Sequence, residues 1–155
     1  MQVMYLAKKY MVSSLADKCT QYLHDNLDES NVFSILPFAE KCEEHSLADQ
    51  CWKVIDRSTK MAVESDGFLT LERSLLETVV ERARRDRKIR QLHLFTAVNR
   101  WAKKECERQG LEAGGEGKRK VLGERVINQL LFPDLLIKDV EIGRASCRER
   151  VYVLV

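Results

Sequence analysis

Apolar residues recur at steps of three and four along most of the chain, the spacing that places side chains on one face of an α-helix. Alternating polar and apolar runs, which would indicate strands, are scarce. Short connections join the helices, so we expect an all-α fold of antiparallel helix pairs, either a bundle or a short solenoid. No internal repeat is strong enough to prove the solenoid. The predicted helices cover residues 14–27, 31–42, 46–64, 70–82, 89–109 and 118–131.

Residue types that begin or end helices set the expected boundaries. Ser13 or Ser14 is expected to cap the first helix, and Ser30 the second. Pro37 should kink the second helix or delay its start. The third, fifth and sixth helices should end at Gly67, Gly110 and Pro133, with a flexible loop over residues 111–118.

The stretch before the first of these helices, residues 5–12, is helical in pattern but too short to be stable alone. It must therefore pack on other residues. We interpret the apolar side chains in and next to this stretch, Met4, Leu6, Tyr10 and Met11, as the end of a preceding domain.

Composition narrows the class of protein further. The 155 residues are 45% hydrophobic and 32% charged, as in a globular protein. Lys and Arg number 26 against 24 Asp and Glu, a net charge of +2 that gives no reason to expect a nucleic-acid or membrane partner. No apolar stretch approaches a membrane span of about 18 residues, and the start lacks the pattern of a secretory signal peptide. We therefore expect a cytoplasmic protein.

The sequence gives only weak support for catalytic or metal-binding groups. Cys42 and His45 have the spacing of two zinc ligands, with Cys51 nearby, but a closed zinc site needs four ligands. The five cysteines are an odd number and lie, apart from Cys147, in helical patterns, so we expect reduced thiols, mostly in the core. The sequence offers no glycine-rich phosphate loop and no convergent carboxylate pair. We therefore expect neither an enzyme nor a bound metal or cofactor.

A dense basic run occupies residues 82–90, with six basic side chains and one acidic one. It has the charge to hold phosphate but no aromatic side chains to stack on bases. We favour a solvated, charged helix turn, with nucleic-acid binding as the alternative. Trp52 and Trp101 lie within apolar stripes, which favours core packing over a ligand platform.

Five stretches of the sequence resemble one family. They are similar, in this order, to the BACK region of BTB/POZ domain-containing proteins, in the subgroup that also carries a C-terminal PHR domain. The resemblance covers residues 5–133, and its most specific pieces include the Cys51–Trp52 pair and residues 99–101 and 118–123. The stretches read YLAKKYMV, LADKCTQYLHDNLDESNVFSIL, LADQCWKVIDRSTKMAVESDGF, LFTAVNRWAKKECERQG and KRKVLGERV.

The resemblance implies a division of the chain. Residues 1–12 would be the last helix of a BTB/POZ domain that is otherwise missing. Residues 13–140 would be a BACK domain truncated at its C-terminus, with residues 13–43 as its 3-box. Residues 141–155 break every helical stripe and resemble the translation of a sequencing adapter, so we expect this tail not to be native.

Members of this family are substrate adaptors of cullin-3 RING ubiquitin ligases, and some are associated with neuronal development. The resemblance therefore implies a non-catalytic segment that links a BTB/POZ domain to a substrate-binding region. Cullin-3 binding should be weak without the BTB domain, through which the full-length parent would form a homodimer. The alternative is a free-standing helical protein-protein interaction module.

Within the 3-box, the candidate partner-binding residues are Tyr22, Phe33 and Leu36. Each is also a candidate for the core, because the spacing of apolar residues alone does not say which stripe faces outward.

Overall fold

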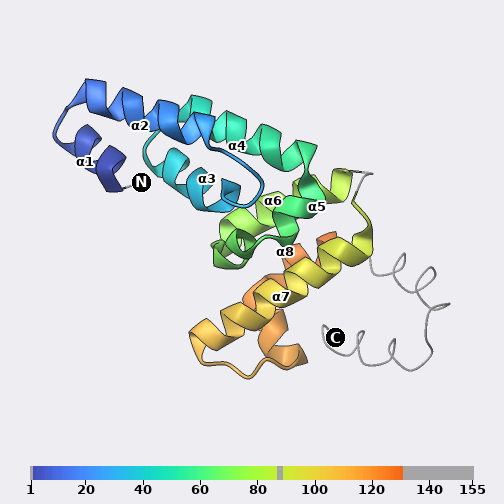
Figure 1. Ribbon diagram of the computed structural model, residues 1–155. Helices are drawn as coiled ribbons and strands as arrows, with labels where there is room; N and C mark the ends of the chain where they lie inside the picture. Colours follow the sequence, from blue (N-terminus) through green and yellow to red (C-terminus); the bar gives the residue numbers. More distant parts are fainter. Residues whose placement is uncertain (1, 87–88, 131–155) are drawn as a thin grey trace. The chain divides into compact units, whose positions relative to one another are not determined.

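The computed structural model describes residues 2–86 and 89–130. Over these ranges the chain forms α-helices, one short 3-10 helix and no strand, which confirms the predicted all-α fold (Figure 1). The chain divides into two compact units, Met1–Thr70 and Leu71–Val155. The elements are α1 (Gln2–Lys9), α2 (Ser13–Asp25), α3 (Val32–Lys41), α4 (His45–Arg57), α5 (Thr59–Glu64), η1 (Asp66–Thr70), α6 (Arg73–Arg85), α7 (Gln91–Gln109) and α8 (Gly115–Gln129).

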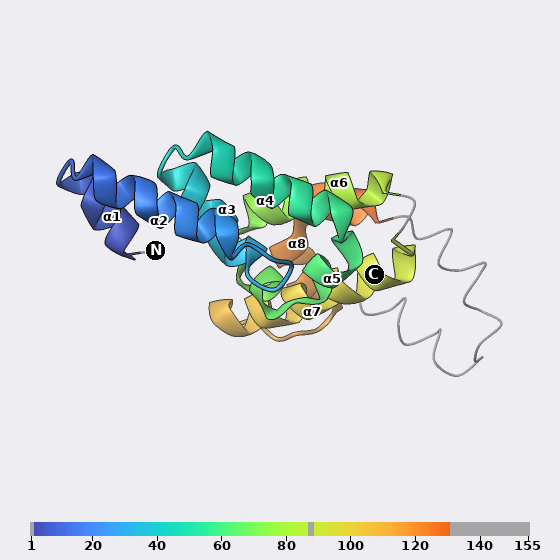
Figure 2. The ribbon, with the colours of Figure 1, turned by 45° about the horizontal axis from the view of Figure 1, so that its top comes forward.

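The first unit consists of two helical hairpins, α1–α2 and α3–α4, followed by α5 and η1. Helix α2 packs against α4 as well as against α1, so the two hairpins lie side by side (Figure 2). The η1 segment packs on α3, where the rings of Phe68 and Phe33 meet edge to face with centroids 5.6 Å apart. The apolar core of this unit comprises Met4, Ala7, Ala16, Val32, Phe33, Ile35, Leu36, Ala39, Leu47, Cys51, Ile55, Ala62, Val63 and Phe68.

The two hairpins turn in the same way. Met11 and Glu43 each adopt the left-handed backbone conformation, with φ of 55° and 57°. This conformation is uncommon for residues other than glycine and closes the preceding helix in both hairpins. The next amide donates to the carbonyl of a buried alanine five residues earlier, Val12 to Ala7 at 2.8 Å and Glu44 to Ala39 at 2.9 Å.

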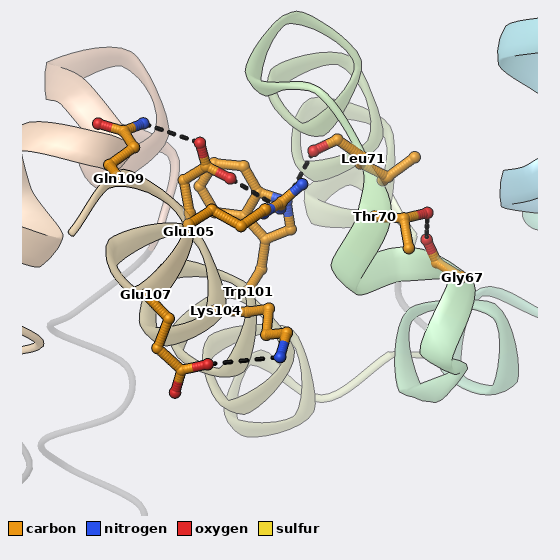
Figure 3. A network of polar contacts seen from close by, with 9 residues as sticks. Gly67, Thr70, Leu71, Trp101, Lys104, Glu105, Glu107 and Gln109 are labelled. Carbon is orange, nitrogen blue, oxygen red and sulfur yellow. Dashed lines mark hydrogen bonds and ion pairs between the residues drawn. The ribbon is translucent and has the colours of Figure 1, made fainter. Parts of the chain in front are cut away.

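The second unit packs α6 and α7 against α8 and against each other. Trp101 of α7 is fully buried and donates its indole N–H to the carbonyl of Leu71 at 3.0 Å (Figure 3). The core position predicted for Trp101 is therefore confirmed, whereas Trp52 in the first unit is half-buried. The apolar core of the second unit comprises Leu71, Leu76, Val79, Val80, Ala83, Ile89, Leu94, Phe95, Ala97, Val98, Trp101, Ala102, Cys106, Val121, Leu122, Val126 and Leu130.

The helix predicted over residues 46–64 is divided into α4 and α5. Ser58 leaves the helical region, with φ −129° and ψ 44°, while its amide donates to Val54 and its carbonyl accepts from Ala62. A side-chain hydrogen bond joins Ser58 to the carboxylate of Glu29 and holds the pKa of that carboxyl below its usual value. The apolar stripe continues on both sides of Ser58, so its periodicity could not reveal the break.

The serine cap predicted for α2 is wrong. This helix begins at Ser13, so the preceding residue is Val12, whose apolar side chain makes no capping hydrogen bond. Ser14 lies one residue inside the helix. The first turn is held instead by backbone bonds, since the amides of Leu15 and Ala16 both donate to the Val12 carbonyl.

The cap predicted for the second helix is also wrong. The residue before α3 is Asn31, and Ser30 instead donates its amide and its hydroxyl to the carboxylate of Asp28, at 2.8 and 2.6 Å. These bonds lower the pKa of the exposed Asp28 carboxyl. Pro37 lies inside α3, and the helix starts at Val32, so the proline does not delay its start.

Helix α8 begins inside the segment that was predicted to be a loop. Its first residue is Gly115, and a Cβ at Gly117 would collide with the loop carbonyl of Glu112. Glycine at this position lets the loop lie directly on the first turn of the helix. The stop predicted at Gly110 is confirmed, because this residue ends α7 with φ 66°. Pro133 and the tail over residues 141–155 lie outside the described residues.

A second glycine interrupts α8 itself. Gly123 has φ 71° and ψ 165°, which is not helical. The guanidinium of Arg73 on α6 occupies the space that a Cβ at this position would need. The carboxylate of Glu77 pairs with Arg73 at 3.3 Å and with Arg125 of α8 at 3.4 Å. These ion pairs hold the Arg73 side chain next to Gly123.

Candidate interaction surface

Exposed apolar side chains gather on one hairpin of the first unit. Among the described residues, the large hydrophobic side chains that remain exposed lie on α1, α2 and their turn, with Met61 of α5 as the exception. Large exposed apolar patches mark sites of protein-protein interaction, so these side chains are candidates for one. The residues of the hairpin are Val3, Tyr5, Leu6, Tyr10, Met11, Val12, Leu15 and Tyr22.

One stripe of this surface runs along α1. Val3, Leu6 and Tyr10, here named the α1 stripe, follow each other at steps of three and four and are all exposed. The amide of Tyr10 donates to the carbonyl of Leu6 at 2.9 Å, so Tyr10 continues the helical path beyond Lys9. The hidden face of the same helix carries Met4, which is buried.

A second stripe runs along α2. Leu15, Lys18 and Tyr22, here named the α2 stripe, share one face of the helix at the same spacing. Leu15 is 40% exposed and Tyr22 is 66% exposed, and Lys18 is exposed between them. Cys19 lies beside this stripe and is half-buried. The stripe therefore consists of a cation with one apolar side chain on each side of it.

Polar contacts hold the hairpin that carries both stripes against the next one. The ammonium of Lys8 donates to the carbonyl of Cys42 at 2.6 Å, at the C-terminus of α3, and pairs with Glu44 at 2.5 Å. A cation is favourable there because the C-terminal end of a helix carries partial negative charge. Between α2 and α4, Nδ1 of His24 is hydrogen-bonded to Oε1 of Gln50. The two stripes are thus fixed to a packed scaffold.

The structure separates the three candidate residues predicted from the sequence. Tyr22 is exposed on the α2 stripe. Phe33 and Leu36 are 1% and 0% exposed, because α3 is packed between α4 and η1. Phe33 and Leu36 therefore lie in the core, which was the alternative to a place on the partner-binding surface. Leu15 was not singled out as a surface residue, because it lies in the same apolar stripe as Tyr22 and spacing alone does not say which of these side chains is exposed.

Thiol chemistry has little support in the described residues. The four cysteines in this part of the chain are free, as predicted, while Cys147 lies outside it. Burial raises the pKa of the Cys51 thiol to about 12, and burial also raises the pKa of Cys106. Both thiols stay protonated at neutral pH and are poor nucleophiles. No group of three His, Cys, Asp or Glu side chains in residues 2–86 and 89–130 is arranged to hold a metal ion.

The described part of the basic run lies on the last turn of α6 and beyond it. Arg84 and Arg85 are exposed, and Arg85 pairs with Glu81 at 2.6 Å. Cations are favourable at a helix C-terminus. Residues 87 and 88 lie outside the described part of the chain. None of the helices that the structure describes combines the length and the apolar character needed to cross a membrane.

The stacked hairpins form an all-helical domain whose exposed apolar stripes are a candidate surface for another protein. The chain belongs to the BACK family, "BTB And C-terminal Kelch", whose model matches residues 32–112. The match begins at Val32, the first residue of α3, so α1 and α2 lie outside it. The domain boundary predicted at residue 13 stays a prediction.

Similar proteins carry the name of a second domain. BTB/POZ domain-containing protein 6 of Mus musculus is 36% identical over 143 residues, which are 92% of this chain and 26% of that protein. BTB/POZ domain-containing protein 3 of Homo sapiens is 34% identical over 143 residues, which are 92% of this chain and 27% of that protein. The chain thus spans about a quarter of the length of the curated relatives it matches. No solved structure matches the chain.

Proposed function

We propose that this chain is a non-catalytic adaptor segment of a cullin-3 RING ubiquitin ligase, linking a BTB/POZ domain to a substrate-binding region. Membership of the BACK family and the similarity to BTB/POZ domain-containing proteins support the proposal. The observation that carries it is the exposed apolar surface of α1–α2, directly before the matched BACK region. An adaptor needs such a surface because its work is to hold partners, not to break bonds.

The two stripes have different partners in this proposal. Residues 1–12 form the last helix of a BTB/POZ domain, and the remainder of that domain covers the α1 stripe. Residues 13–43 form the 3-box, from which Tyr22 faces cullin-3. Burying an exposed aromatic side chain at a protein interface contributes strongly to affinity, since tyrosine is among the residue types enriched at interface centres.

The proposed mechanism is proximity. An adaptor of this kind holds a substrate protein near a recruited ubiquitin-conjugating enzyme and so raises the effective concentration of the reacting groups. It works in the cytoplasm as part of a homodimer that forms through the BTB/POZ domain. The raised pKa of the buried Cys51 thiol and its lack of exposure agree with a role that uses no thiol chemistry.

A pull-down with the N-terminal region of cullin-3 tests the proposal. The chain alone is expected to bind weakly, and the same chain fused behind a BTB/POZ domain is expected to bind well. Tyr22→Ala in the fused chain should weaken capture several-fold, whereas Met61→Ala, which removes an exposed side chain of α5, should not. If the fused chain captured no cullin-3, the adaptor role would have to be abandoned.

The alternative function is a free-standing helical interaction module. The observation that favours it is that each unit has its own buried apolar core. A monomeric chain that unfolds cooperatively without a BTB/POZ domain would support the module. An expanded state that binds hydrophobic dyes, with helical content but no fixed packing, would argue for a fragment that needs its missing domain.

A further inference from the structure

A side chain of α1 joins the turns of the two hairpins in the first unit. Lys8, on the last turn of α1, donates to the carbonyl of Cys42 at 2.6 Å and pairs with the carboxylate of Glu44 at 2.5 Å. Cys42 directly follows α3, and Glu44 directly precedes α4. One ammonium therefore links α1 to both helices of the second hairpin. These contacts between Lys8, Cys42 and Glu44 are here named the Lys8 bridge.

Hydrogen-bonded backbone holds both ends of the Lys8 bridge in place. Glu44 donates its amide to the carbonyl of the buried Ala39 at 2.9 Å, which closes the turn after α3. In the first hairpin, Val12 donates its amide to the carbonyl of the buried Ala7 at 2.8 Å, and Ala7 is the neighbour of Lys8. The bridge therefore joins two points whose backbone is fixed by the same kind of turn.

The surroundings of the Lys8 bridge make it stronger than an ion pair in open water. The side chains of Lys8 and Glu44 are 33% and 21% exposed, so solvent screens their charges only in part. The Cys42 carbonyl lies at the C-terminal end of α3, where the partial negative charge of the helix favours a cation. The neighbouring Lys9 is exposed, and its ammonium lies 5.8 Å from the centre of the Tyr10 ring. Lys9 is thus a lysine of the same helix end that takes no part in the bridge.

A second polar contact joins the two hairpins at a different place. Near the C-terminus of α2, Nδ1 of His24 is hydrogen-bonded to Oε1 of Gln50 on α4. The Lys8 bridge lies by the α1–α2 turn, at the opposite end of α2. Helix α1 packs on α2, and α2 packs on α4, so both contacts fix the first hairpin to the second. Two separate fixed points oppose a rotation of one hairpin on the other, whereas a single point leaves a pivot.

We propose that the Lys8 bridge sets the orientation of a BTB/POZ domain relative to the BACK domain. The inference rests on the proposed function, in which residues 1–12 end the BTB/POZ domain while α3 and α4 belong to the BACK domain. Lys8 then reaches from one domain into the other and is a positioning residue, not a catalytic one. Because an adaptor works by proximity, this orientation decides where a bound substrate is held relative to the rest of the ligase.

A distance distribution tests the proposal. The full chain, fused behind a BTB/POZ domain, carries one nitroxide amino acid in that domain and one in place of the exposed Lys53 on α4, and it is diluted with unlabelled chain. Double electron-electron resonance should give a narrow distribution of distances. Lys8→Met should widen it about twofold, because the first hairpin then pivots about the His24 contact. The matched control Lys9→Met should leave the width unchanged, as should Lys8→Arg, whose guanidinium still donates to both partners.

The outcomes decide this proposal separately from the proposed function. Circular dichroism confirms that the variants keep their helices, so that a wider distribution reports orientation. A wide distribution for Lys8→Met together with a narrow one for Lys8→Arg would support the role of the bridge. A narrow distribution for Lys8→Met, an equally wide one for Lys9→Met, or a wide one for the unsubstituted chain would overturn it. The measurement needs no cullin-3, so a fused chain that captures no cullin-3 would overturn the proposed function without changing these distances.

Discussion

Two glycines of the second unit have left-handed backbones for different reasons. Gly110 ends α7 with φ 66°, and nothing lies within 4 Å of the place where a Cβ would be. Gly123 interrupts α8 with φ 71°, and there the Arg73 guanidinium fills that place. The first site demands only a conformation, whereas the second also demands the absence of a side chain.

Alanine substitutions should separate these two demands. Gly110→Ala is expected to lower the free energy of unfolding by about 1 to 2 kcal/mol, the cost of a left-handed conformation for an L-residue with a side chain. Gly123→Ala should lower it further, because the Arg73 side chain must also move. Urea denaturation of both variants measures the difference. Adding Arg73→Ala to Gly123→Ala should remove part of the extra loss, and equal losses for both single variants would contradict this account.

The role of a single residue was predictable from the sequence where the local backbone conformation determines it. Gly110 was found because glycine after a long apolar stripe is typical of a helix end. Tyr22, Phe33 and Leu36 share the same apolar character, yet Tyr22 is exposed and the other two are buried. That difference depends on which neighbours α2 and α3 have, and periodicity carries no such information.

At the scale of elements, the Lys8 side chain attaches α1 to the α3–α4 turn. Lys8 reaches the carbonyl of Cys42 at 2.6 Å and the carboxylate of Glu44 at 2.5 Å. An isolated helix as short as α1 is unstable in water, so this contact and the burial of Met4 and Ala7 keep it folded.

Removing the Lys8 ammonium should loosen α1. Lys8→Met keeps the aliphatic stem but loses both polar contacts, so we expect the free energy of unfolding to fall by about 1 kcal/mol. Backbone amides of α1 should also exchange with solvent faster, as hydrogen exchange would show. The matched control, Lys9→Met, changes an exposed neighbour that has no such contacts to α3 and α4, and it should have a much smaller effect. Equal exchange of α1 in both variants would show that Lys8 is not the anchor.

The sequence predicted that the elements are helices, but it predicted less well where each helix begins and ends. The stripe over residues 46–64 predicted one helix, because apolar spacing passes through Ser58 without interruption. At the break the Ser58 side chain is hydrogen-bonded to Glu29, which is far away in sequence, and apolar spacing does not reveal such a contact. Similarly, the glycine-rich segment before residue 118 predicted a loop, but the approach of the Glu112 carbonyl to Gly117 allows α8 to start there.

At the scale of the whole molecule, the all-helical fold fits membership of the BACK family. The proposed function depends on a different feature, the exposed apolar surface. The BACK match covers residues 32–112, and the exposed apolar stripes lie before it on α1 and α2. Helical content and family were accessible from the sequence, because stripes and motifs are local. Which apolar side chains stay exposed was not accessible from the sequence, because their exposure depends on how the two hairpins stack.

The most direct measurement of the central claim is an affinity difference. Isothermal titration compares the binding of the cullin-3 N-terminal region to a BTB/POZ domain alone with its binding to the same domain carrying this chain. Tighter binding is expected when the chain is attached, because the α2 stripe then adds Leu15 and Tyr22 to the interface. Equal affinities for the two proteins would contradict it, since the chain would then contribute nothing to the contact with cullin-3.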